Sequence, residues 1–176
     1  MARVVVYDAC VLHPAPLRDL LIRIARAGLV RARWTDAILD ECFRSILRRR
    51  PELASPLERT RELMNAAVAD CLIIGYEDLA DTLKLPDPND RHVLGAAIRA
   101  GAETIVTANL ADFPAKHPDE FVVELINSAP AVVLGIIARQ AADLRNPPRT
   151  VDEVLDMLQA VGLGRAVARV RELFGG

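Results

Sequence analysis

Short β-branched runs alternate with longer helical patterns over the first two thirds of this chain. The runs "RVVVYD" (3–8) and "TIVTAN" (104–109) are continuously apolar before their polar ends, which is typical of strands buried on both faces. Helical spacing covers 14–29, 36–49, 56–68 and 91–100, and "EDLADTL" (77–83) predicts a short helix. "DCLIIG" (70–75) predicts another strand and "VRARW" (30–34) a short extended piece. This alternation predicts an α/β fold with a central, mostly parallel sheet flanked by helices.

The last third of the chain contains only helical patterns. These patterns start near Pro118 and are interrupted by "SAP" and "NPPRT", which predicts three or four helices. We therefore expect a main domain at 1–117 and a helical extension at 118–176 that packs on it.

Composition limits the cellular setting. No apolar run approaches the roughly 20 residues needed to cross a bilayer, and the start of the chain lacks the pattern of a signal peptide. The three cysteines are far apart and form no C-x-x-C motif, which favours a reducing compartment over a disulfide framework or a zinc site. We expect a cytoplasmic protein that does not contact a membrane.

Charge is distributed unevenly. Residues 14–61 carry eleven arginines against six acids, whereas residues 62–128 carry four bases against twelve acids. This pattern is compatible with a polyanion that binds the basic part and reacts at an acidic centre, although an arginine-rich genome would give the same excess. Three arginines of the second helix, Arg44, Arg48 and Arg49, are the candidates for RNA binding.

Several carboxylates are expected at one edge of the sheet. Asp8 follows the first strand, Asp112 follows "TIVTAN", and Asp90 starts the helix at 91–100. Ligands of open parallel sheets gather outside the carboxyl ends of the strands, so these acids should meet there. Because no lysine lies beside them to offset their repulsion, a bound divalent cation explains the cluster better than internal ion pairs do.

Three segments together resemble the PIN-domain family, and in particular the VapC-type toxins of bacterial toxin–antitoxin modules. The segments are "VVVYDACVLHPAPLRDLL", "RWTDAILDE" and "LPDPNDRHVLGAAIRAGAETIVTANLADFP", within residues 3–114. The resemblance implies a PIN-like three-layer nuclease domain that hydrolyses RNA phosphodiesters with Mg²⁺ or Mn²⁺. It implies Asp8, Glu41, Asp90 and Asp112 as catalytic and metal-binding residues, with Asn109 as a supporting polar residue. The expected partners are an RNA substrate, a cognate antitoxin protein and a second copy in a homodimer.

Each acid also has an ordinary structural explanation. Asp8 and Asp90 could cap helices, Glu41 could pair with Arg44 or Arg48 on its own helix, and Asp87 suits a turn. The three histidines show no ligand spacing and are expected to be structural or exposed. A phospho-accepting receiver domain also clusters acids at strand ends, but the two lysines of this chain follow no suitable strand.

Two departures from the family pattern leave a second function open. Relatives usually have an amide or hydroxyl two residues after the first acid, where this chain has Cys10, a weak donor that behaves mostly as an apolar group. Relatives also have a short strand after the last acid, where this chain has "FPAKH". Either that edge strand is missing here or "FPAKH" is a shortened form of it. The alternative is a catalytically weak PIN-like scaffold that binds RNA or a protein without cutting.

Overall fold

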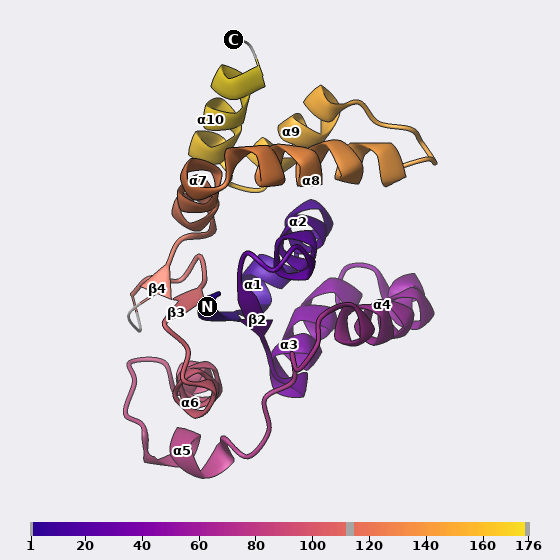
Figure 1. Cartoon of the computed structure of the whole chain (residues 1–176). Coiled ribbons are helices and arrows are strands. Elements are labelled where there is room, and N and C mark those ends of the chain that lie inside the picture. The colour runs from indigo at the N-terminus through magenta and orange to yellow at the C-terminus, as the bar shows by residue number, and fades with distance from the viewer. Residues whose placement is uncertain (1, 112–114, 175–176) are drawn as a thin grey trace.

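The computed structural model describes residues 2–111 and 115–174, and a four-stranded sheet lies at its centre (Figure 1). The strands are β1 (Val4–Tyr7), β2 (Arg31–Arg33), β3 (Thr104–Val106) and β4 (Ala115–Lys116). They are all parallel and their order is β2-β1-β3-β4. The predicted α/β fold with a parallel sheet is confirmed.

Helices make up most of the remaining chain. Their bounds are α1 (Ala9–Leu12), α2 (Ala15–Arg26), α3 (Asp36–Leu47), α4 (Ala54–Ala67), α5 (Glu77–Thr82), α6 (Arg91–Ala100), α7 (Pro118–Ser128), α8 (Pro130–Asp143), α9 (Val151–Ala160) and α10 (Gly164–Phe174), with 3₁₀ turns η1 (Pro51–Leu53) and η2 (Pro88–Asp90). The helices predicted from periodicity are present, and the four-residue α1 is an addition. Thr35 caps α3 by accepting from Ile38 N at 3.0 Å, and Gly101 ends α6 in the left-handed conformation at φ +60°.

The connections place helices on both faces of the sheet. The chain passes from β1 to β2 through α1 and α2, and then crosses back over β1 to β3 through α3 to α6. Because parallel crossovers are right-handed, connections that run in opposite directions lie on opposite faces. Of the second connection, α6 packs on β1 and β3 with α5 outside it, whereas α1 and α2 lie across the sheet and α3 and α4 pack on them (Figure 1). The carboxyl ends of β1 and β3 therefore form the topological switch point, where open α/β sheets bind ligands.

The prediction of a strand at 70–75 is wrong. This segment makes a single parallel bridge, between Leu72 and Trp34, just beyond the end of β2. Asp70 and Gly75 have positive φ angles of 53° and 67°, so the chain turns at both ends before a ladder can extend. Its apolar residues point alternately inward and outward, and Ile74 is 78% exposed.

A very short edge strand takes the place of the strand expected after Asp112. β4 has two residues and pairs with β3, and Thr107 N donates to Lys116 O at 3.1 Å. The shortened-strand alternative is therefore the one that the structure supports. Lys116 and Arg3 both pair with Glu124 of α7, and the Lys116 ammonium contributes most to lowering the pKa of that carboxyl. These ion pairs join the sheet edge to the C-terminal helices.

The C-terminal helices form a layer against α2. α8 and α9 pack on α2, whereas α10 packs on α7 and α9. The carboxylate of Asp119, which is 8% exposed, accepts from Arg165 N and Ala166 N at 3.2 and 2.8 Å and thus caps the start of α10. Within the described residues no single helix is long and apolar enough to cross a membrane. The pair α7 and α8 reaches that length and apolar character only when the two helices are counted together, and they are bent by 119° relative to each other.

Candidate metal-dependent active site

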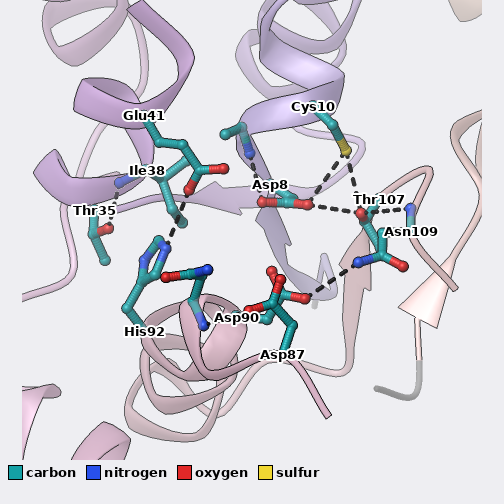
Figure 2. Close-up of polar contacts among 12 residues, drawn as sticks. Asp8, Cys10, Thr35, Ile38, Glu41, Asp87, Asp90, His92, Thr107 and Asn109 are labelled. Carbon is teal, nitrogen blue, oxygen red and sulfur yellow. Dashed lines mark hydrogen bonds and ion pairs between the residues drawn. The ribbon is translucent and has the colours of Figure 1, made fainter. Parts of the chain in front are cut away.

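Asp8 is the buried centre of the candidate site. It follows β1 directly, caps α1, and is 7% exposed. Its Oδ1 accepts from Ala9 N at 2.7 Å, and its Oδ2 accepts from the Thr107 hydroxyl at 2.7 Å (Figure 2). A carboxylate offers about four acceptor positions, so these bonds fix the side chain and leave acceptor capacity for a ligand.

Thr107 holds Asp8 from the neighbouring strand. β1 and β3 pair in register with Tyr7 opposite Val106, so the next residues, Asp8 and Thr107, leave the sheet side by side. Thr107 is fully buried, and its Oγ1 also accepts from Asn109 N at 3.0 Å. The sequence interpretation missed this residue. A hydroxyl at the carboxyl end of a buried strand, level with a buried aspartate, is the signal that could have identified it.

Cys10 is part of the same polar network. Its Sγ lies 3.3 Å from Asp8 Oδ2 and 3.2 Å from Thr107 Oγ1, and it accepts from Ala108 N at 3.3 Å. Because Thr107 gives its only hydroxyl hydrogen to Asp8, the Cys10 thiol is the donor toward Thr107 or Asp8. Burial and the Asp8 charge raise the pKa of this thiol to about 11, so it stays protonated at neutral pH. The expectation that Cys10 behaves mostly as an apolar group is therefore wrong.

Asp90 approaches the site from the start of α6. It occupies the N-cap position, but within the described residues its carboxylate takes no capping bond from the first turn. Instead its Oδ2 accepts from Asn109 Nδ2 at 3.2 Å (Figure 2). Asp87 caps the preceding 3₁₀ turn η2, where its Oδ1 accepts from Asn89 N at 2.8 Å. The turn role expected for Asp87 is confirmed, and the capping role expected for Asp90 is wrong.

Glu41 reaches the site from α3. Its Oε2 lies 3.3 Å from His92 Nε2 of α6, and its side chain is 55% exposed. The alternative that Glu41 pairs with Arg44 or Arg48 has no support among the contacts of the described residues, because the contact is with His92. The sequence interpretation took His92 as structural or exposed and missed this contact between α3 and α6.

The donor set suits a hard divalent cation. The carboxylates of Asp8, Glu41 and Asp90 come from three elements and face one opening between them (Figure 2). Mg²⁺ and Mn²⁺ prefer such oxygen ligands, and Mg²⁺ commonly takes only one or two carboxylates with several waters. Within residues 2–111 and 115–174 no three acidic, histidine or cysteine side chains stand close enough to close a metal site on their own. The fourth predicted acid, Asp112, lies outside the described residues.

The candidate RNA-binding arginines separate into two surroundings. Arg49 lines a hollow of about 340 Å³ together with Cys10, Glu41 and His13, beside the acidic centre. Arg44 lines a different hollow, beside Asp40, and Arg48 is exposed at the end of α3. Arg49 is thus the arginine of the three that borders the same hollow as Glu41.

Comparisons with known proteins agree with this fold. The family model described as PIN domain matches residues 4–111, and the model described as VapC50 C-terminal domain matches residues 118–172. A Mycobacterium tuberculosis (strain ATCC 25618 / H37Rv) protein named "Putative ribonuclease VapC50" is 31% identical over 138 residues, which cover 70% of this chain and 78% of that protein. No solved structure matches the chain.

Proposed function

This chain belongs to the PIN-domain family, and on that premise we propose that it is a metal-dependent endoribonuclease that acts as the toxin of a toxin–antitoxin module. The observation that carries the proposal is the approach of Asp8, Glu41 and Asp90 to one opening at the switch point of the sheet. The name of the Mycobacterium tuberculosis relative supports RNA as the substrate. The proposed partners are an RNA, a cognate antitoxin protein and a second copy in a homodimer, and the proposed compartment is the cytoplasm.

The proposed roles of Asp8, Glu41 and Asp90 rest on their contacts, and that of Asp112 rests on the family resemblance alone. Asp8, Asp90 and Asp112 would hold Mg²⁺ or Mn²⁺, and Glu41 would either join them or orient the attacking water. A divalent cation held there makes water a better nucleophile near neutral pH and offsets charge on the phosphate. Thr107 keeps Asp8 in one orientation, and Asn109 does the same for Asp90.

The exposed side of the site supplies the proposed contact with RNA. Arg49 borders the hollow that Glu41 and Cys10 also line, so its guanidinium can bind a backbone phosphate next to the acids. His13 lines the same hollow, and burial together with the charges of Arg49 and Arg18 lowers the pKa of its imidazole. A neutral imidazole there can donate one hydrogen bond and accept another, as contact with a sugar or base requires.

The alternative of an inactive scaffold is not favoured. Two departures from the family pattern favour it, namely Cys10 two residues after the first acid and a missing or shortened strand after the last acid. The Cys10 thiol, however, bonds within the Asp8 and Thr107 network, and β4 occupies the sheet edge.

The test is cleavage of RNA by the purified chain in Mg²⁺, in Mn²⁺ and in a chelator. We expect cleavage with a divalent cation only. We expect Asp8→Asn to reduce it by more than about 100-fold, because even the outer partners of metal ligands contribute about 10- to 100-fold. Asp78→Asn, an exposed acid of α5, is the matched control and should cut like the parent. Equal cleavage by parent and Asp8→Asn would overturn the proposal.

A further inference from the structure

A cavity of about 490 Å³ lies between α2, α4, α8 and α9, lined by none of the acids proposed to bind metal. Its apolar wall includes Ile22, Leu63, Met64, Leu144 and Met157. α2 and α4 belong to the part of the chain that matches the PIN domain, whereas α8 and α9 belong to the C-terminal domain, so the cavity lies at their junction. Pockets of this size, mostly apolar and between domains, are typical binding sites for small molecules.

A buried amide in the wall of this cavity has one atom without a partner. Gln140 is 2% exposed, and its Nε2 donates to Pro16 O at 3.0 Å. Within the described part of the chain, its Oε1 accepts from no donor. The two amide atoms cannot be exchanged, because a carbonyl oxygen only accepts and therefore requires the nitrogen of Gln140 to face it. A buried acceptor of this kind is destabilising until a donor reaches it.

The same cavity is bordered by two arginine side chains that form no ion pair with a carboxylate of the described residues. Arg18 donates to the carbonyl oxygens of Leu12 and His13 at 2.7 and 3.2 Å, and no carboxylate of the described residues forms an ion pair with it. Burial lowers the pKa of Arg18, an effect that a bound anion would oppose. Arg26 is exposed at the cavity and likewise has no ion pair within residues 2–111 and 115–174.

The acid on this wall, Asp19, offsets part of the Arg18 charge but forms no ion pair with Arg18 or Arg26. Both carboxylate oxygens of Asp19 accept from Arg23 Nε at 3.0 Å. The cavity therefore combines an apolar wall, an excess of positive charge and a buried acceptor that needs a donor.

We propose that this cavity binds an acyl-chain hydroxy acid. The apolar chain lies against Ile22 and Met64, the carboxylate pairs with Arg18 and Arg26, and the hydroxyl donates to Gln140 Oε1. This ligand site is separate from the nuclease site, and the proposal does not depend on RNA cleavage.

The test is isothermal titration calorimetry of the full chain with 3-hydroxydecanoate, decanoate and decanol. We expect saturable one-to-one binding of the hydroxy acid. Decanoate lacks the donor and decanol lacks the anion, so each should bind about tenfold more weakly, as expected for one lost charge-assisted or buried hydrogen bond.

Variants assign the binding to this cavity. Arg26→Gln should weaken binding of the hydroxy acid about tenfold, while Arg44→Gln, an exposed arginine at another hollow, should leave it unchanged. Ala67→Phe fills part of the cavity and should abolish binding. Gln140→Leu should bind decanoate and the hydroxy acid equally, because the acceptor that distinguishes them is gone.

Two outcomes would overturn the proposal. The first is the absence of saturable heat from the hydroxy acid with the parent protein. The second is equal binding by the parent, Arg26→Gln and Ala67→Phe, which would indicate adsorption elsewhere on the surface. Circular dichroism of each variant establishes folding, and if Gln140→Leu does not fold, Arg26→Gln and Ala67→Phe decide the question.

Discussion

Replacing Thr107 with valine should weaken both the fold and the proposed catalytic site. The substitution nearly preserves the shape of a fully buried side chain but removes the hydroxyl that donates to Asp8 Oδ2 at 2.7 Å. It also removes the oxygen that accepts from Asn109 N at 3.0 Å. Both Asp8 and the backbone after β3 thus lose a partner at one position.

The size of the effect follows from these contacts. A hydrogen bond to a charged group contributes about 1.5–3 kcal/mol, and the neutral bond from Asn109 about 1 kcal/mol. The extra methyl group of valine offsets about 0.8 kcal/mol of the loss. We therefore expect a free energy of unfolding lower by about 2–3 kcal/mol. At about 2–4 °C per kcal/mol for a chain of this length, the melting temperature should fall by about 4–12 °C.

Urea unfolding gives the stability, and RNA cleavage at a temperature where the variants are folded gives the activity. Thr107→Val should cut about 10- to 100-fold more slowly, as when the outer partner of a metal ligand is lost. Thr107→Ser keeps the hydroxyl and should remain within a few-fold of the parent rate, although the lost methyl lowers its stability by about 1 kcal/mol.

A second buried threonine provides the control. Thr35 is also fully buried, but it caps α3 and takes no part in the Asp8 network. Thr35→Val should lower stability by about 1 kcal/mol without slowing cleavage by folded protein. The reasoning is refuted if Thr107→Val is as active as Thr107→Ser, or if Thr35→Val slows cleavage as much as Thr107→Val.

Three further perturbations test other parts of the site. The parent should melt at a higher temperature in Mg²⁺ or Mn²⁺ than in chelator, because a cation at a hundredfold excess over its dissociation constant adds about 2.7 kcal/mol to the free energy of unfolding. Asp90→Asn should lose much of this gain, and equal gains in the parent and the variant would exclude Asp90 as a ligand. Arg49→Ala should weaken RNA binding and reduce the slope of its salt dependence by about one phosphate contact, whereas Arg44→Ala should change neither. Equal salt slopes for the two variants would contradict the assignment of Arg49 to a phosphate contact. The pKa of His13 is lowered from 6.5 by burial and by the charges of Arg49 and Arg18, so the unfolded state takes up this proton first as the pH falls. The free energy of unfolding should therefore decrease as the pH falls below 6.5, and His13→Gln should flatten that decrease in urea melts, whereas an unchanged slope would remove His13 as its cause.

Local sequence determined most of the secondary structure and the position of one key acid. Continuous β-branched residues in "RVVVYD" and "TIVTAN" have no polar side to expose, so they predict central parallel strands, and both runs form them. Pro, Gly and Thr35 mark helix ends because they act on the neighbouring backbone alone. The place of Asp8 at the end of the first strand follows from these local rules.

Edge structure was harder to predict because pairing requires a partner of the right length. The segment at 70–75 has the composition of a strand, but it lies past the end of β2 and its ends turn away after one bridge at Leu72. Ala115 and Lys116 of "FPAKH" in contrast lie beside β3 and form a two-residue strand despite the poor strand composition of that segment. Composition cannot distinguish these cases, since both depend on where neighbouring backbone groups lie.

The contacts within the candidate site were decided by tertiary structure. Thr107 is 99 residues from Asp8, His92 is 51 residues from Glu41, and Asn109 is 19 residues from Asp90. The sequence by itself supplied the acids and the edge of the sheet at which they gather. Which hydroxyl, imidazole or amide meets each acid depends on the register of β1 with β3 and on the reach of Glu41 from α3 to His92 of α6, and no local pattern encodes either of these.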